Sequence, residues 1–127
     1  MFEIIDFPLV SDSRGNLVYF QNSDQIPFKI KRVYLYFESD FNLFTNGYSF
    51  KEQDEVMVAL NGGFDVTIQN FDGSSSKISI NRKNQGLYLK SNTWRHIKNL
   101  SKGTIILFIS NCEFKEEDII KNIKDLN

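Results

Sequence analysis

Cysteine is almost absent from this sequence of 127 residues, and the single one, Cys112, cannot form a disulfide within the chain. Cysteine this scarce is typical of proteins from a reducing compartment. Cys112 follows the apolar run 104–109, so we expect it to pack near the core rather than to act as a nucleophile. Long hydrophobic runs are missing too, since none approaches the ~20 residues that span a bilayer. Because residues 1–6 also lack a basic region and a cleavage site, we expect a cytoplasmic protein without a membrane partner.

An excess of charge of one sign is absent as well. The chain has 15 Lys and Arg against 16 Asp and Glu, a formal net charge of −1, and its lysines are scattered. Surfaces that bind nucleic acid need a basic patch, so we expect no nucleic-acid partner. A chain of this length with 41% hydrophobic residues can bury a core of its own. We therefore predict one globular domain spanning residues 1–127.

The chain does contain a series of short apolar stretches broken by turn residues, which is typical of β-strands. The clearest is residues 29–37, where side chains alternate with period two. This alternation places Arg32, Tyr34 and Tyr36 on one face of a strand. Other strands are predicted at residues 2–7, 17–20, 55–60, 64–69, 77–80, 86–89, 94–97 and 104–110.

Two local signals refine this pattern. Residues 55–60 run into Asn61-Gly62, a dipeptide that favours a tight hairpin, so residues 64–69 are predicted to return beside them. The C-terminal residues favour a helix, because acidic side chains at 114–118 suit a helix N-terminus. Apolar residues would then form one helical stripe: Phe114, Ile119, Ile120, Ile123 and Leu126. Without strand–helix–strand alternation, the sequence predicts an all-β sandwich or barrel of about ten strands with a short C-terminal helix.

Four stretches, in order, carry a resemblance to a known family. They read D-S-R-G-N-L at 12–17, I-P-F-K-I-K-R-V-Y at 26–34, V-M-V-A-L-N-G at 56–62 and G-L-Y-L at 86–89, the last followed by Trp94. Together they resemble the dTDP-sugar 3,4-ketoisomerases, also described as WxcM-like or QdtA-like cupins. The tail from Phe114 to Lys121 is similar to the ending of these proteins. The second stretch is the most specific of the four.

The resemblance implies a cupin barrel, an RmlC-like jelly roll, that dimerises with a second copy, commonly by exchanging an N-terminal strand. It implies a dTDP-linked deoxysugar as ligand and isomerisation of dTDP-4-keto-6-deoxyglucose, in which the carbonyl moves from C4 to C3 through an enediol. The product serves the 3-amino-3,6-dideoxy sugars of surface polysaccharides such as lipopolysaccharide. Neither a metal nor a cofactor is required. The chemistry is general acid–base catalysis, and Tyr34, at the end of the I-K-R-V-Y stretch, corresponds to a tyrosine usually given a catalytic role.

The sequence departs from the family at its histidines. Counting back from Asn61-Gly62 places Tyr48 and Phe50 where the family has an H-x-H motif, and Arg95 where it has a third histidine. A one-residue deletion would instead bring Ser49 and Phe50 to the motif. Both alignments leave these positions without histidine. The one histidine of the chain, His96, is a residue late, so a strand would point it to the opposite face.

These departures leave the acid–base set open. Tyr48 would serve as a base only if a cation, Arg32 or Arg95, lowered its pKa, and a buried Glu55 is the other substitute. We therefore name Tyr34, Tyr48 and Glu55 as candidate catalytic residues. Without histidine, Tyr48, Phe50 and Glu55 cannot form a transition-metal site, so no metal is expected.

The candidates for substrate binding come from the same stretches, and they are Arg32, Tyr36, Tyr88 and Arg95. Arg32 and Tyr36 share the face of Tyr34, whereas Tyr88 would stack on a nucleobase, line the pocket or pack in the core. Arg95 inside a barrel needs an anion beside it, which would be the pyrophosphate of the ligand, Glu55 or Asp65, or else it points outward.

Three functions remain open from the sequence. The first, which the missing histidines favour, is a sugar-nucleotide-binding cupin that has lost catalysis, with Phe50 filling part of its pocket. The second is an active 3,4-ketoisomerase or related epimerase with a non-histidine acid–base set. The third is a dimeric interaction domain without a nucleotide site.

Overall fold

The computed structural model describes residues 2–21, 24–37, 46–70 and 72–126, and nearly all of its regular structure is β-strand. The predicted all-β class is thereby confirmed. The strands are β1 (Phe2–Asp6), β2 (Leu9–Asp12), β3 (Gly15–Val18), β4 (Arg32–Phe37), β5 (Ser49–Phe50), β6 (Glu55–Asn61), β7 (Phe64–Gln69), β8 (Ser75–Ile80), β9 (Gln85–Leu89), β10 (Arg95–Lys98), β11 (Ile105–Ser110) and β12 (Ile119–Ile120).

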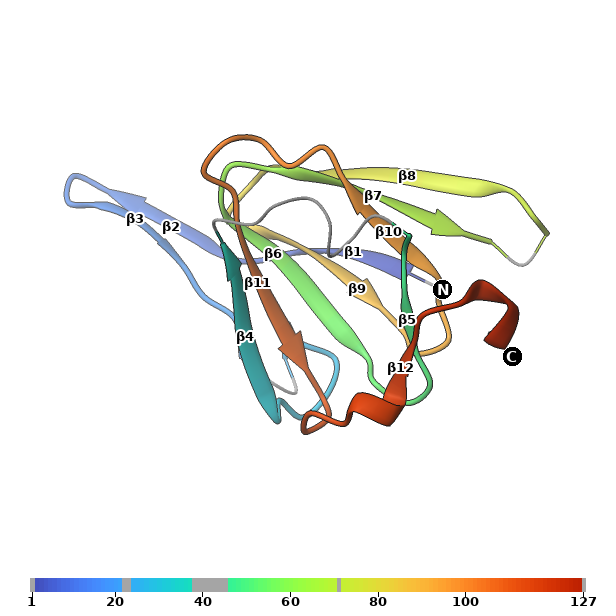
Figure 1. Ribbon diagram of the computed structural model, residues 1–127. Coiled ribbons are helices and arrows are strands. Elements are labelled where there is room, and N and C mark those ends of the chain that lie inside the picture. Colours follow the sequence, from blue (N-terminus) through green and yellow to red (C-terminus); the bar gives the residue numbers. More distant parts are fainter. Residues whose placement is uncertain (1, 22–23, 38–45, 71, 127) are drawn as a thin grey trace.

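Two antiparallel sheets face each other as a jelly-roll barrel (Figure 1). One has the order β1-β9-β6-β11-β4 and the other the order β10-β7-β8. A short sheet of β5 and β12 lies beside them, and an isolated bridge between Tyr48 and Arg95 connects β5 to β10. The β2–β3 hairpin projects from the barrel at the far left of Figure 1.

Residues 55–59 of β6, in the middle of the five-stranded sheet, are buried on both faces, which explains the continuous apolar run of this strand. Met57 and Ala59 point into the barrel and join the main core with residues of the opposite sheet, such as Val66 and Ile97. The alternate residues of β6 belong to a second cluster on the outer face of the sheet, with Phe7, Ile26, Val56, Val58, Tyr88 and Ile109. The side chain of Glu55 belongs to the inward set, because it precedes Met57 by two residues.

The turn at Asn61-Gly62 is present, but the predicted hairpin is wrong. Gly62 has a φ of +66°, as such a turn requires, yet β6 pairs with β9 and β11 while β7 pairs with β8 and β10. The turn therefore carries the chain from one sheet to the other. It is held by the 101–104 turn, where a Cβ on Gly62 would lie 2.5 Å from the Thr104 hydroxyl oxygen.

The predicted C-terminal helix is also wrong. The tail forms two single 3-10 turns, η2 (Glu116–Asp118) and η3 (Ile123–Asp125), with β12 between them. Pairing of Ile119 and Ile120 with β5 outweighs the weak helical preference of this segment, since β-branched residues fit a strand better. The C-terminal tail is thus part of the β-structure, through the pairing of β12 with β5.

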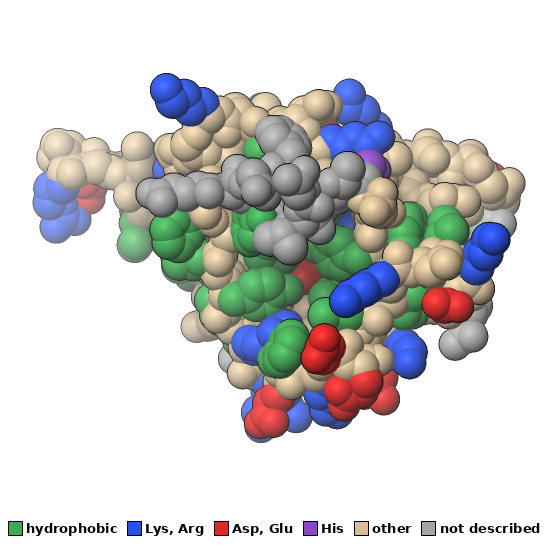
Figure 2. All heavy atoms as spheres, in the orientation of Figure 1, with side chains coloured by type: hydrophobic (Ala, Val, Ile, Leu, Met, Phe, Trp, Pro, Cys, Tyr) green, Lys and Arg blue, Asp and Glu red, His purple; other side chains and the backbone are tan. Residues whose placement is uncertain are grey.

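The face drawn in Figure 2 carries hydrophobic side chains across its middle and a mixture of Lys, Arg, Asp and Glu along its lower edge. Charges of both signs therefore alternate there, in line with the near-neutral net charge. Within the described ranges, no helix is long and apolar enough to cross a membrane.

Candidate active site

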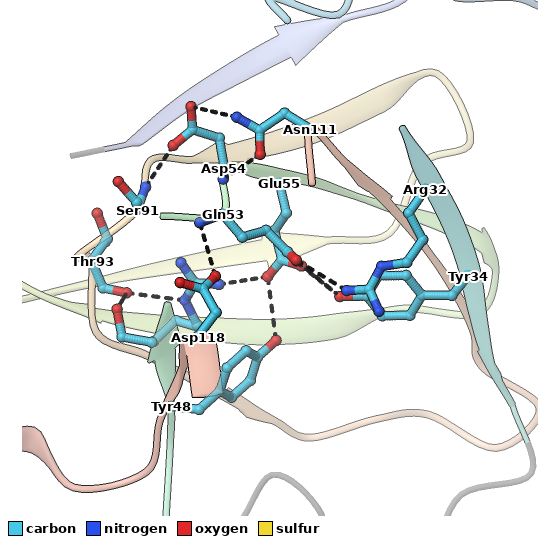
Figure 3. Close-up of polar contacts among 12 residues, drawn as sticks. Arg32, Tyr34, Tyr48, Gln53, Asp54, Glu55, Ser91, Thr93, Asn111 and Asp118 are labelled. Atoms are coloured by element: carbon cyan, nitrogen blue, oxygen red, sulfur yellow. Dashed lines mark hydrogen bonds and ion pairs between the residues drawn. The ribbon is translucent and has the colours of Figure 1, made fainter. Parts of the chain in front are cut away.

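Three of the predicted site residues surround the carboxylate of a fourth, Glu55, inside the barrel (Figure 3). Tyr34 reaches it from β4, Arg95 from β10, and Tyr48 from the residue before β5. The strand alternation predicted for residues 29–37 explains the first contact, because the inward residues of β4 are half-buried while their neighbours are exposed. The shared face predicted for Arg32, Tyr34 and Tyr36 is confirmed, and it points into the barrel.

The centre of the network is a buried ion pair. Arg95 Nη1 donates to Glu55 Oε2 at 2.5 Å, and both side chains have no exposed surface. Arg95 Nε donates to the backbone carbonyl of Thr93 at 3.0 Å. Among the expected anions for Arg95, the partner is Glu55, whereas Asp65 contacts Ser79 and Lys77 at the surface. Removing two charges from water costs free energy, and the attraction between Arg95 and Glu55 must offset that cost. The pair is therefore not by itself evidence that the fold gains stability from it.

Two phenols complete the surroundings of Glu55. Tyr34 Oη donates to Glu55 Oε1 at 2.9 Å, and Tyr48 Oη donates to Oε2 at 3.4 Å. Burial, and then the negative charge of Glu55, raise the pKa of both phenols above the ordinary value of tyrosine. Arg95 acts in the opposite direction on Tyr48 but does not outweigh them. Tyr48 is therefore not activated as a base by its cation, and both phenols stay protonated and can donate hydrogen bonds.

Arg32 is held above the ring of Tyr34, with its guanidinium carbon 4.3 Å from the ring centre. Its Nη2 donates to Gln53 Oε1 at 3.0 Å. Sequence reasoning missed Gln53, although a signal was available: it lies two residues before Glu55, so an extended chain places both side chains on one face. It is buried, at 2% exposure, and joins Arg32 to the network.

The other predicted residues lie around or outside this centre. Tyr36 is on the inward face of β4, opposite Ile106, and packs against the main core. Phe50 is buried beside Tyr48 and Arg95, so it occupies interior space as expected.

Tyr88 and His96 are not brought to the network. Tyr88 lies in the second cluster on the opposite face of the sheet, opposite Val56 in register, and burial raises the pKa of its phenol. His96 follows the inward Arg95 on β10 and so occupies the outward position of that strand, as the one-residue offset predicts.

Two buried guanidinium nitrogens lack a hydrogen-bond acceptor in the part of the chain that is described: Arg32 Nε and Arg95 Nη2. Buried donors are normally satisfied, so these two fit a site for an anionic or carbonyl oxygen. Among the described residues, no group of three or more His, Cys, Asp or Glu side chains is arranged to hold a metal ion. The arrangement can therefore donate protons from phenols, accept one on a carboxylate and stabilise negative charge with arginine.

Comparison with known proteins identifies relatives over the whole chain. The model of the family described as "FdtA: WxcM-like, C-terminal" matches residues 1–127. The TDP-4-oxo-6-deoxy-alpha-D-glucose-3,4-oxoisomerase of Aneurinibacillus thermoaerophilus is 29% identical over 120 residues, which cover 94% of this chain and 85% of that protein.

Solved structures agree with this match. The WlaRB TDP-quinovose 3,4-ketoisomerase of Campylobacter jejuni superposes with a TM-score of 0.90 at 30% identity, covering 98% of this chain and 95% of that one. A histidine-to-asparagine variant of the 3,4-ketoisomerase QdtA of Thermoanaerobacterium thermosaccharolyticum, in complex with TDP-4-keto-6-deoxyglucose, gives 0.89 at 27% identity, covering 98% and 93%. With its barrel and its interior network of tyrosine, glutamate and arginine, this chain belongs to the WxcM-like family of sugar 3,4-ketoisomerase homologues.

Proposed function

We propose that this protein is an active dTDP-sugar 3,4-ketoisomerase that works without histidine. The observation that carries the proposal is the Glu55 carboxylate, buried inside the barrel and surrounded by two phenol donors and one guanidinium. A buried charge is costly, and functional sites are where proteins commonly retain one. A relative with the same barrel holds TDP-4-keto-6-deoxyglucose, which supports a dTDP-linked 4-keto-6-deoxyhexose as the substrate.

The reaction needs only proton transfers, and the residues present can supply them. Glu55 accepts the proton from C3 of the sugar, while Tyr34 protonates the C4 carbonyl oxygen as the enediol forms. The Tyr34 phenolate then takes the proton of O3 while the protonated Glu55 gives its proton to C4, which returns both residues to their starting states. The net change is one proton from C3 to C4 and one from O3 to O4. Arg32 Nε and Arg95 Nη2, which have no acceptor among the described residues, stabilise the negative charge that develops on the oxygens. Neither an oxidant nor a metal is required.

A second candidate function is binding of the sugar nucleotide without turnover. It is favoured by the position of His96 on the outward side of β10 and by Phe50, which fills interior space beside Arg95. Both functions share the substrate class and the two arginines, and they differ in whether Glu55 takes part in proton transfer.

Proton NMR of dTDP-4-keto-6-deoxyglucose in D2O separates the two. An active enzyme gives the 3-keto product and deuterium at C3 or C4, and Tyr34→Phe lowers the rate at least roughly 100-fold. Tyr19→Phe, at an exposed tyrosine, is the matched control and should turn over normally. Binding of dTDP without product or exchange by the wild-type protein would reject catalysis and leave the binding function.

We also propose that the protein is a homodimer. β4 is the last strand of its sheet, and its outer face exposes Val33, Leu35 and Phe37 at 56%, 49% and 55%. The projecting β2–β3 hairpin exposes three more apolar side chains: Leu9, Val10 and Leu17. Apolar side chains gathered on an edge strand and a protruding hairpin are suited to contact with a second copy. In analytical ultracentrifugation Leu35→Asp should sediment as a monomer, while Ser75→Asp, on the exposed part of β8, should remain a dimer.

The cellular setting follows from the substrate class. We place the protein in the cytoplasm, in the supply of 3-amino-3,6-dideoxy sugars for lipopolysaccharide or a related surface polysaccharide. Its 3-keto product would then be consumed by a transamination at C3.

A further inference from the structure

The side-chain amide of Gln53 lies between Arg32 and the hydrogen-bonded pair of Tyr34 and Glu55 (Figure 3). On one side its Oε1 accepts from Arg32 Nη2 at 3.0 Å. On the other side its Nε2 lies 3.4 Å from Tyr34 Oη and 3.4 Å from Glu55 Oε1. With 2% of its surface exposed, Gln53 has little water to replace these partners.

The direction of this amide is fixed by its neighbours. Arg32 has only donors, so the group that faces it must be the oxygen of Gln53. The NH2 group therefore faces Tyr34 and Glu55, where it donates to the phenol oxygen. Because that oxygen already accepts from Gln53, the proton of Tyr34 points to the remaining acceptor, Glu55 Oε1.

The C-terminal tail holds Gln53 in this place. Asp118 accepts hydrogen bonds on its carboxylate from the backbone N–H of Glu52 at 2.8 Å and of Gln53 at 3.1 Å. The Asp118 backbone carbonyl accepts from Lys51 N–H at 2.9 Å. The segment that carries the amide is thus anchored to η2 rather than free to shift along the barrel.

We propose that Gln53 is a positioning residue that sets the direction of the Tyr34–Glu55 hydrogen bond, with Asp118 as its anchor. Because Arg32 can only donate hydrogen bonds, it fixes the orientation of the Gln53 amide. The oriented amide in turn fixes the direction in which the Tyr34 hydroxyl donates. Its effect on turnover rests on the proposed isomerase function, whereas the direction of the hydrogen bonds does not.

The kinetic test is Gln53→Glu. The introduced carboxylate still accepts from Arg32 but can no longer donate to Tyr34, so the phenol turns away from Glu55. We expect kcat to fall roughly 10- to 100-fold and KM for the sugar nucleotide to stay within about 2-fold. Gln69→Glu adds the same charge at an exposed position and should change neither.

The pH profile of Gln53→Glu distinguishes positioning from a general loss of structure. The introduced carboxyl is flanked by Arg32, Tyr34 and Glu55, and when protonated it has a donor again and mimics the amide. Turnover of the variant should therefore recover as the pH is lowered, relative to wild type. Two results would overturn the proposal. One is a kcat of the variant equal to that of wild type at all pH values, and the other is a raised KM with no recovery of turnover at low pH.

A measurement without turnover keeps the proposal independent of the enzyme assay. With 15N-labelled glutamine side chains, NMR should show contacts from the Nε2 protons of Gln53 to Tyr34 and none to the guanidinium protons of Arg32. Contacts to Arg32 would mean a reversed amide and reject the proposed direction even in an active enzyme. If the wild type shows the expected contacts but no turnover, the isomerase function fails and the positioning of Tyr34 stands.

Discussion

Replacement of Arg95 by methionine tests the electrostatics at the centre of the barrel. Arg95→Met keeps much of the apolar contact with Tyr48 and Phe50 but leaves Glu55 buried without its cation. Removal of one partner of a fully buried ion pair costs about 3 to 5 kcal/mol, because the remaining charge is neither solvated nor compensated. The hydrogen bonds from Tyr34 and Tyr48 reduce this cost without replacing a guanidinium.

The loss can be expressed as a melting temperature. Unfolding entropy is roughly 2.1 cal/mol/K per residue, or about 0.27 kcal/mol/K for this chain of 127 residues. Arg95→Met should therefore lower Tm by about 11 to 19 °C. Glu55→Gln in the same chain removes the uncompensated charge, so the double variant should be more stable than Arg95→Met alone.

Urea denaturation and calorimetry of the wild type, the two single variants and the double variant form a double-mutant cycle. Lys77→Met is the matched control, because its ion pair with Asp65 lies at the surface, with 64% of the lysine side chain exposed. Its effect should be much smaller. A loss below about 1 kcal/mol for Arg95→Met, or strictly additive variants, would refute the argument that burial makes this pair strong and interdependent.

Three further outcomes follow from the structure. Burial and the charge of Glu55 raise the pKa of Tyr34 and Tyr48, so above about pH 10 the unfolded chain loses phenol protons that the native protein keeps. The free energy of unfolding therefore falls with rising pH, by about 1.4 kcal/mol per pH unit for each tyrosine. In urea titrations from pH 9 to 11.5, Tyr34→Phe and Tyr48→Phe should each make this decline less steep, and an unchanged slope would contradict it. Asp118→Ala leaves the backbone N–H groups of Glu52 and Gln53 without their acceptor. It should lower the free energy of unfolding in urea by about 1 to 3 kcal/mol, whereas an unchanged value would exclude the anchoring role. Gly86→Ala would place a Cβ 2.6 Å from the ring of Phe7, so it should cost about 1 to 3 kcal/mol by thermal melting, and wild-type stability would show that the ring moves freely.

The strands could be predicted from the sequence because their signal is local. Period-two alternation in residues 29–37 correctly placed Arg32 and Tyr34 on one face of a strand, whereas the resemblance was needed to expect that face inside the barrel. Tyr48 and Glu55 were also expected in one site, because the resemblance aligned their spacing with a motif of the family. Composition alone gives no such alignment, and the two side chains are in contact in the structure.

The errors occurred where tertiary pairing decides. Asn61-Gly62 specifies a turn but not which strands flank it, and here the turn joins two different sheets. The tail has apolar residues at helical spacing, but Ile119 and Ile120 gain more by pairing with β5. The face of Tyr88 could not be predicted either, because both faces of β9 are buried and alternation then carries no information about which side is the barrel interior.

The anchoring of Gln53 by Asp118 has a consequence for how the protein assembles. The two residues are 65 positions apart, and β1 likewise finds its partner β9 across most of the chain. Such distant pairings make folding slow, on the order of milliseconds to seconds, because the chain must close large loops before it gains contacts. During synthesis, residues 46–61 emerge well before the aspartate that fixes them, so the interior network stays without a defined proton direction until the tail has docked. Maturation of the site and completion of the fold are then one event.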